Sequence, residues 1–211
     1  MPHDTNTNYG VAEGNEKVVL DGTKTILLVG VGGQGTILAG QLLAMVAADA
    51  GLDVKVSEIH GMSQRGGSVS TVVRVGEKVE SMVCDPGCAD IVVAFEAVEA
   101  LRAQQFLRDG GTMFVNDEQI VPVSVNVGNF TMPADTEERL EAIGAVRIDA
   151  GEIARAAGSP KSTNVVLVGA LSTALPFSVE EWQDAIRRRV PPKTIDANLR
   201  AFARGREAAE A

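Results

Sequence analysis

The chain has 211 residues, of which 45% are hydrophobic and 22% charged, and its formal net charge is −9 at pH 7. This composition supports a sizeable core and excludes wholesale disorder, and the acidic balance with only 4% aromatic residues argues against a nucleic-acid binder. No apolar run approaches the roughly 20 residues of a membrane span, and the polar first residues carry no secretory signal, so we expect a cytoplasmic protein.

The first ordered elements form a βαβ unit that follows a polar lead-in. Residues 1–23 are rich in Asn, Thr, Asp, Gly and Glu, and we expect a flexible tail there, followed by a single domain over residues 24–211. Thr25–Gly30 has the apolar run of a buried strand, Thr36–Ala50 repeats leucine at helical spacing, and Asp53–Ser57 is the next strand. The order predicts parallel strands joined by a right-handed crossover.

The middle of the chain continues the alternation of strands and helices. The alternating runs Val69–Val75 and Lys78–Val83 flank a Gly-Glu turn and predict a β-hairpin insertion. Further strands are predicted at Ile91–Phe95, Thr112–Asn116, Val121–Val127 and Ala145–Ile148. Helices are predicted at Glu96–Arg108, Glu137–Ile143, Glu152–Ala157 and Asn164–Leu175. The last of these helices is apolar nearly all round, which is typical of a buried helix.

Two helices are predicted to close the chain over residues 178–208. Ser178 and Glu181 form a capping-box pattern at the start of the first, and Pro191–Pro192 ends it. The second carries the apolar stripe Ile195, Leu199 and Phe202, which we expect to pack on its own domain. The fold class predicted overall is α/β: a Rossmann-like three-layer sandwich with a mainly parallel sheet, a β-hairpin insertion and C-terminal helices.

The loop GVGGQG after the first strand is the first candidate site. Gly30, Gly32 and Gly35 satisfy the G-x-G-x-x-G pattern of a dinucleotide-binding loop, and Glu58 lies where an acidic ligand of the ribose belongs. The same glycines also suit a tight strand-to-helix turn with no ligand. Because Gly33 and Gln34 are not part of the dinucleotide pattern, the loop alone leaves both interpretations open.

A second candidate site is the segment SEIHGMSQRGGS that follows the second strand, where α/β sheets place their binding crevices. Its polar and glycine residues can present a basic tip to a carboxylate or phosphate, or dock into a partner protein, whereas a solvated loop is the plain alternative. The candidate residues in this segment are Glu58, His60, Gly61, Ser63, Gln64, Arg65, Gly66, Gly67 and Ser68.

The two cysteines of the chain, Cys84 and Cys88, flank an Asp-Pro-Gly turn. Such a C-x-x-x-C loop can bind a metal or change its redox state, but a plain turn with two thiols is the simpler interpretation. An iron–sulfur cluster takes about four thiolates, and the only histidines are His3 and His60. We therefore expect no metal or cluster on this chain.

Taken together, GVGGQG and SEIHGMSQRGGSV resemble the gamma-type subunits of 2-oxoacid:ferredoxin oxidoreductases. The resemblance runs from about Thr25 to Phe202 and includes STNVVLVGAL, which contains the candidate residue Asn164. The tail, PFSVEEW…RVPPK…NLRAF, is most similar to the indolepyruvate branch of that family. The polar lead-in and the Cys84/Cys88 pair have no counterpart in the family pattern.

The resemblance implies an enzyme that oxidatively decarboxylates an aryl 2-oxoacid, transfers the acyl group to coenzyme A and reduces ferredoxin. It implies that thiamine diphosphate and the iron–sulfur clusters lie in a larger alpha subunit and that this chain binds no cofactor and is inactive alone. Gln34, His60, Gln64 and Arg65 are then expected at the crevice between the subunits, with Arg65 facing an anionic group.

Several alternatives stay open. The chain can belong to the branches that use pyruvate, 2-oxoisovalerate or 2-oxoglutarate. It can be a free-standing NAD(P)-binding protein, or a purely structural binding module. The isolated chain can also form a self-dimer, and the sequence does not decide its oligomeric state. The sequence does not decide which 2-oxoacid is used or where coenzyme A binds.

Overall fold

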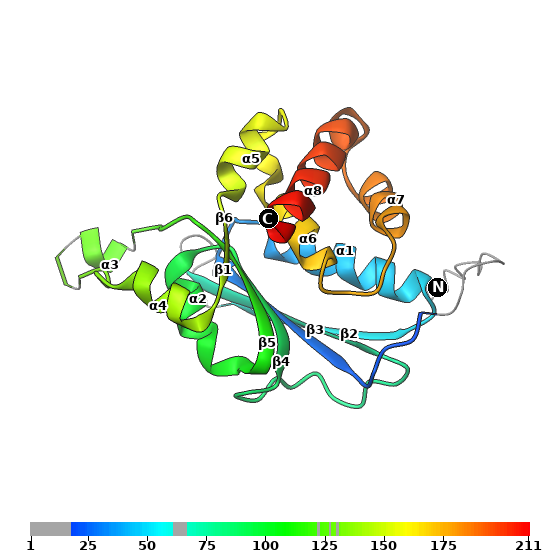
Figure 1. Ribbon diagram of the computed structural model, residues 1–211, viewed down its shortest axis with the longest axis horizontal. Helices are drawn as coiled ribbons and strands as arrows, with labels where there is room; N and C mark the ends of the chain where they lie inside the picture. Colours follow the sequence, from blue (N-terminus) through cyan, green and yellow to red (C-terminus); the bar gives the residue numbers. More distant parts are fainter. Residues whose placement is uncertain (1–17, 61–66, 122, 127, 130) are drawn as a thin grey trace, which may run out of the picture.

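The computed structural model describes residues 18–60, 67–121, 123–126, 128–129 and 131–211, and its centre is a six-stranded sheet of order β2-β3-β1-β4-β5-β6 (Figure 1). The strands are β1 (Lys24–Val31), β2 (Asp53–His60), β3 (Ser68–Gly76), β4 (Ala89–Ala94), β5 (Leu107–Asn116) and β6 (Val146–Ile148). From β1 to β6 the neighbouring strands are parallel, and β3 is antiparallel to both β1 and β2. The predicted α/β fold with a mainly parallel sheet is confirmed.

The hairpin is formed by β2 and β3, so the predicted pairing of Val69–Val75 with Lys78–Val83 is wrong. The first of these runs lies in β3, but its partners are β2 on one edge and β1 on the other, with Val73 opposite both Val56 and Ile26. Because β3 has no free edge left, residues 78–83 lie in a loop. Arg74 holds this loop by hydrogen bonds to the carbonyls of Ser81 and Val83.

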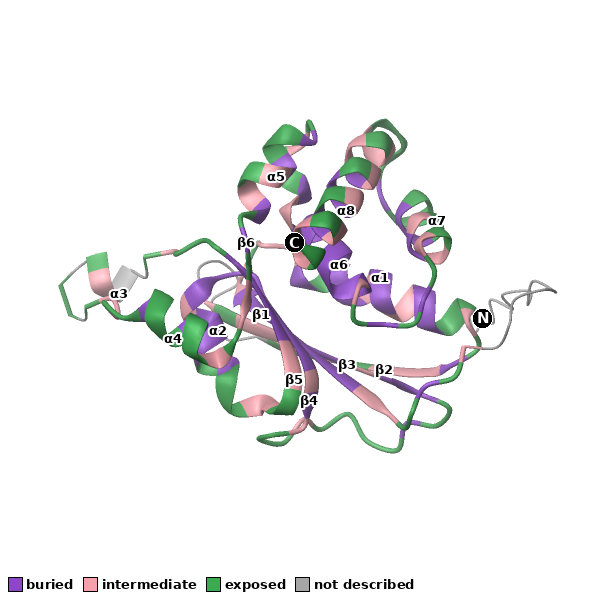
Figure 2. Ribbon diagram, in the orientation of Figure 1, coloured by how far each residue is buried: buried purple, intermediate pink, exposed green. Residues whose placement is uncertain are grey.

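Helices cover both faces of the sheet and complete three layers (Figure 1). One face carries α1 (Thr36–Asp49), α5 (Ala150–Ala156), α6 (Thr163–Ser172), α7 (Val179–Arg189) and α8 (Ile195–Glu210). The other face carries α2 (Ala97–Ala103) and α4 (Thr136–Ile143), beyond which lies the short α3 (Val123–Asn126). The side chains of β1 alternate between two cores: Ile26 and Leu28 face the larger one, whereas Leu27 and Val29 face the smaller one. Buried residues accordingly line the inner sides of the layers (Figure 2).

Two predicted elements differ in the structure. The helix predicted for Glu96–Arg108 ends at Ala103, and after a 3-10 turn the chain enters β5 at Leu107, which pairs with Ala89. The strand predicted for Val121–Val127 is replaced by the short helix α3, in keeping with Pro122, which cannot donate a hydrogen bond to a sheet.

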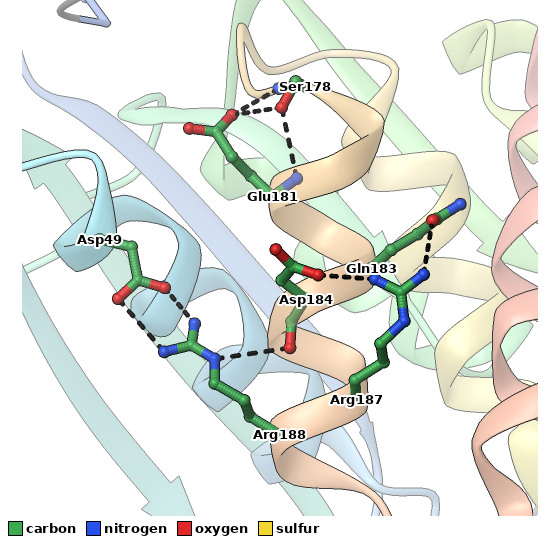
Figure 3. A network of polar contacts seen from close by, with 7 residues as sticks. All are labelled: Asp49, Ser178, Glu181, Gln183, Asp184, Arg187 and Arg188. Atoms are coloured by element: carbon green, nitrogen blue, oxygen red, sulfur yellow. Dashed lines mark hydrogen bonds and ion pairs between the residues drawn. The ribbon is translucent and has the colours of Figure 1, made fainter. Parts of the chain in front are cut away.

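The C-terminal helices begin and end close to the predicted signals. Ser178 and Glu181 form a complete capping box at the start of α7: the Ser178 Oγ accepts from the Glu181 N–H, and the Glu181 carboxylate accepts from the Ser178 N–H (Figure 3). Arg188 of the same helix pairs with Asp49 at the end of α1, which ties these two helices together (Figure 3). Phe202 of α8 is fully buried, so the predicted packing of its apolar stripe on the core of the same chain is confirmed.

Part of the predicted flexible tail packs on the domain. The structure describes residues 18–23 of that tail, and the Leu20 side chain is buried in the larger core. None of the helices in the described part of the chain is long and apolar enough to cross a lipid bilayer.

Candidate functional site

The glycine loop between β1 and α1 packs closely against a side chain of α6. Gly35 is the N-cap of α1 and has φ of +86°, a left-handed conformation that glycine adopts without strain. A Cβ atom added to Gly35 would stand 2.5 Å from Nδ2 of Asn164, which begins the buried face of α6. Glycine at position 35 is therefore required both by the turn and by the close approach of Asn164.

The side chain of Gln34 joins the loop to the neighbouring strands. Its Oε1 accepts from the N–H of Val31 at 2.7 Å, and its Nε2 donates to the carbonyl of Phe95 at 2.9 Å, just beyond β4. Asn116, at the end of β5, donates to the same carbonyl at 3.2 Å and to the Glu118 carboxylate at 3.0 Å. The carboxyl ends of β1, β4 and β5 are thus connected by one set of amide hydrogen bonds.

The Glu118 carboxylate lies 3.4 Å from Nε2 of Gln34. A dinucleotide-binding loop needs free N–H groups and a glycine surface at this place, because the pyrophosphate carries negative charge. A carboxylate beside the loop repels such an anion. The geometry therefore favours a structural turn over a pyrophosphate site.

The fold brings the two predicted candidate segments together. The N–H of Gly32 donates to the carbonyl of Gly67 at 2.9 Å, which joins the glycine loop to the end of the segment that follows β2. Gly32, Gly33, Gly35 and Glu58 line one cavity of about 420 Å³. Because β3 lies between β1 and β2, Glu58 is two strands away from β1, roughly 10 Å at the usual strand spacing. The adjacent position that a ribose ligand takes in a dinucleotide fold is occupied here by β3.

Of the remaining residues in the second segment, the structure describes His60 and Ser68 at its two ends. The backbone of His60 ends β2 opposite Val69, and the Ser68 hydroxyl donates to the Glu99 carboxylate at 2.6 Å. Five predicted site residues lie outside the described residues: Gly61, Ser63, Gln64, Arg65 and Gly66.

A further cavity, of about 470 Å³, lies beside Glu96 and was not predicted from the sequence. The Glu96 side chain is only 1% exposed, and its carboxylate accepts from the N–H groups of Glu99 at 2.8 Å and Ile120 at 3.1 Å. Burial raises the pKa of Glu96 above its ordinary value. Glu99 also lines this cavity and pairs with Arg102 at 2.6 Å. The sequence signal was an acidic residue directly after an apolar strand, which alone does not separate a buried carboxylate from an exposed one.

Among the described residues, no group of three or more His, Cys, Asp or Glu side chains is arranged to hold a metal ion. The Cys84 and Cys88 sulfur atoms do lie in contact, 2.9 Å apart. What the site offers in the described ranges is therefore a set of amides, carboxylates and small cavities at the carboxyl ends of β1 and β4.

A family model described as pyruvate ferredoxin/flavodoxin oxidoreductase matches residues 25–208. The chain belongs to this family. The indolepyruvate oxidoreductase subunit IorB of Thermococcus kodakarensis is 46% identical over 88% of this chain and 95% of that protein. The corresponding IorB subunit of Archaeoglobus fulgidus is 40% identical over 85% of this chain and 92% of that protein.

Two solved structures share the fold of this chain. The pyruvate oxidoreductase subunit PORC of Thermotoga maritima superposes with a TM-score of 0.68 at 24% identity, covering 89% of this chain and 97% of that one. A 2-oxoglutarate:ferredoxin oxidoreductase of Magnetococcus marinus, solved with 2-oxoglutarate, coenzyme A and succinyl-CoA bound, gives 0.69 at 23% identity, covering 90% of this chain and 32% of that one. The predicted resemblance to the gamma-type subunits is confirmed, and so is the assignment as an oxidoreductase subunit.

Proposed function

We propose that this chain is the smaller subunit of an indolepyruvate:ferredoxin oxidoreductase, which converts an aryl 2-oxoacid to its acyl-coenzyme A with loss of carbon dioxide and reduces ferredoxin. The observation that carries the proposal is the 46% identity with the indolepyruvate oxidoreductase subunit of Thermococcus kodakarensis over nearly the whole length. A 2-oxoglutarate synthase subunit, KorC of Methanothermobacter marburgensis, is 32% identical over 87% of this chain. The difference favours the indolepyruvate branch over the 2-oxoglutarate branch.

In this proposal the electron carriers belong to a larger partner subunit. Thiamine diphosphate supplies the carbanion chemistry of 2-oxoacid decarboxylation when it is bound, and iron–sulfur clusters carry the electrons. A cluster takes about four thiolates, whereas the whole sequence has two cysteines. The role of this chain is to complete the wall of the catalytic centre. It does so as one domain over residues 24–211, and the complex works in the cytoplasm.

The surface around the end of β2 supports a partner on that side. Ile37 of α1, Ile59 of β2, and Met82 and Val83 of the following loop are large apolar side chains that are 49–63% exposed. Ile37 and Ile59 line the cavity beside the glycine loop, and Ile59, Met82 and Val83 line a second cavity of about 520 Å³ on the other side of the strand. An obligate interface is more apolar than ordinary surface, so we assign this side to the larger subunit.

Within the same proposal, the residues expected at the crevice with the partner are Gln34, His60, Gln64 and Arg65. Arg65 faces an anionic group of the substrate or of coenzyme A through a charge-assisted hydrogen bond. Gln34 contributes by holding the glycine loop in place, because its amide bonds to Val31 and Phe95 of this chain.

The test is reconstitution with the larger subunit. The purified chain alone is expected to be colourless and inactive, and the complex is expected to reduce ferredoxin with indolepyruvate and coenzyme A faster than with pyruvate or 2-oxoglutarate. Turnover by the chain alone, or a preference for a non-aryl substrate, would contradict the proposal. The alternative of a nucleotide-binding protein is tested by calorimetric titration with NAD and NADP. That alternative requires saturable binding of one of the two nucleotides.

The role of Arg65 is tested in the assembled complex. Arg65→Ala is expected to lower activity or coenzyme A affinity at least about tenfold, the loss expected for one charged hydrogen bond. The control is Arg155→Ala, because Arg155 is exposed on α5 and, among the described residues, its side chain bonds to Glu152 of the same helix. Equal activity and affinity of the two variants would remove Arg65 from the site.

A further inference from the structure

The two cysteines of the chain are held with their sulfur atoms in contact. Cys88 Sγ lies 2.9 Å from Cys84 Sγ, within hydrogen-bonding distance for two thiols. Both side chains are half-buried, so small molecules in solution can reach them. Since the chain has no other cysteine, any disulfide within one molecule joins these two residues.

The intervening turn explains the close approach. The Cys88 N–H donates to the carbonyl of Asp85 at 3.2 Å, and Pro86 and Gly87, with a φ of +74° at the glycine, fill the central positions as in a type II turn. The Gly87 N–H donates to the carbonyl of Gln105 at 2.9 Å, which fixes the turn to the segment after α2. Cys88 is thereby placed directly before the buried start of β4.

We propose that Cys84 and Cys88 are a redox-active dithiol, which a low-molecular-weight disulfide oxidises reversibly to an intramolecular disulfide. The bond needs a sulfur–sulfur distance of about 2.05 Å, so the two atoms must approach by roughly 1 Å. The turn already holds the chain in the closed arrangement, and Cys84 directly follows the exposed residues 81–83 and packs on the edge of the smaller core. The proposal concerns the chain free of its larger partner, because Cys84 lines the same cavity as Met82 and Val83, on the side that the proposed function assigns to that partner.

The reaction is a two-step thiol–disulfide exchange. A thiolate of the pair attacks one sulfur of the small disulfide, forms a mixed disulfide and releases one small thiol. The second cysteine then loses its proton, attacks the protein sulfur of the mixed disulfide and releases the other small thiol. Two cysteine thiols and one small disulfide thus become one protein disulfide and two small thiols, with no other reactant.

The surroundings of Cys84 assign the order of attack. Burial raises the pKa of Cys84 to about 12. A hydrogen bond from the Cys84 thiol to Cys88 and negative charge on Cys88 act in the same direction, whereas the positive charge of Arg74 lowers this pKa. Cys84 is therefore a poor first nucleophile, and the first attack falls to Cys88. Once the Cys88 sulfur is in a mixed disulfide it has neither proton nor charge, so both of its contributions to the Cys84 pKa disappear. The Cys84 thiolate then forms more readily and attacks the Cys88 sulfur, which completes the intramolecular disulfide.

The experiment uses the full chain, reduced and kept free of oxygen, with oxidised glutathione as the probe. After acid quenching and alkylation, wild type is expected to lose both alkylation sites together, with the mass of two hydrogen atoms removed, no glutathione attached and a monomer on a non-reducing gel. Dithiothreitol is expected to restore both sites. Stable glutathione adducts on wild type, a disulfide between chains, or two thiols that stay free in excess oxidised glutathione would overturn the proposal.

Two single variants test the order of attack. Cys84→Ser is expected to stop at one glutathione adduct on Cys88, because the second nucleophile is missing. Cys88→Ser is expected to take up glutathione severalfold more slowly at the same pH, because burial, the largest cause of the raised pKa of Cys84, remains when the hydrogen bond and charge of Cys88 are removed. Comparable rates for the two variants would overturn the order assigned to the two sulfur atoms.

Discussion

Gly205 of α8 lies against the backbone of Val166 in α6, so closely that a Cβ atom at position 205 would stand 2.0 Å from the Val166 carbonyl oxygen. The approach is reciprocal: a Cβ on Gly169 of α6 would lie 2.2 Å from the carbonyl oxygen of Phe202 in α8. These two glycines allow α8 to press its buried Phe202 ring into the core beside Trp182, with the ring centroids 6.3 Å apart.

Gly205→Ala is expected to destabilise the chain by about 3 kcal/mol or more, because the added methyl group meets backbone atoms that cannot rotate away. The change in unfolding free energy is measured by urea titration. The matched control is Gly151→Ala in α5, where the nearest atom is the end of the Arg155 side chain at 3.5 Å. That variant is expected to stay within about 1 kcal/mol of wild type. Equal stability of the two variants would refute the close crossing of α6 and α8.

Gly35→Ala tests how the glycine loop packs against α6. The substitution is expected to lower the unfolding free energy for two reasons: the left-handed backbone at position 35, and the Asn164 Nδ2 atom 2.5 Å from the added Cβ. Gly33→Ala carries only a backbone cost, because Gly33 also has a positive φ but nothing lies within 4 Å of its Cβ position. We expect Gly35→Ala to unfold more easily than Gly33→Ala by about 1–2 kcal/mol.

The partner of this contact is identified by a double-mutant cycle. Asn164→Ala removes the colliding amide, so the combined variant with Gly35→Ala is expected to cost less than the two single changes added together. Strict additivity in urea titrations would show that the asparagine is not the group that excludes a side chain at position 35.

Gln34→Glu is expected to destabilise the protein by about 1–3 kcal/mol at pH 7, since a carboxylate cannot donate to the Phe95 carbonyl and lies next to Glu118. Those neighbours disfavour the charged form in the folded state only, so the destabilisation is present above the ordinary glutamate pKa and shrinks on acidification. The control is Gln41→Glu, whose side chain accepts from Arg189 and gains an opposite charge. A loss of stability in Gln34→Glu that is the same at pH 4 and pH 7 would argue against this amide arrangement.

The buried Glu96 predicts a pH dependence of stability. Because burial raises its pKa in the folded state, the folded protein binds the proton more tightly than the unfolded chain does. The stabilisation of the folded protein by protonated Glu96 is fully present below the ordinary glutamate pKa. It is lost as the pH rises through the raised pKa of the folded state. We expect the difference in unfolding free energy between wild type and Glu96→Gln to fall with rising pH across that window. Urea titrations at several pH values measure it, and a pH-independent difference would contradict the shift.

The sequence predicts the layers of this fold well because its buried strands and helices have strong local signals. The apolar run at Thr25–Gly30 and the capping box at Ser178 each correspond to an element within a residue or two of the predicted bounds. Pairing partners have no such signal. The alternation in Lys78–Val83 fits a strand, but both edges of β3 are taken by β1 and β2, and that competition is decided by long-range packing.

The candidate site was predictable in outline and not in detail. Glycine content and position marked both segments, and the hydrogen bond from Gly32 to Gly67 brings them side by side. The bonds that decide what the loop can hold come from Phe95 and Glu118, more than sixty positions beyond Gln34. A single sequence carries no sign of such distant partners, nor of the burial that distinguishes Glu96 from the many exposed carboxylates.

The insertion of β3 between β1 and β2 has a consequence for how the chain acquires its structure. The β2–β3 pair joins residues close in sequence, so it closes with a small loss of chain entropy. The β1–β3 pair joins Lys24 to Val75 and Val31 to Ser68, several dozen positions apart. We therefore expect the β2–β3 hairpin to form first as a local unit, and β1 to pair with its free edge afterwards.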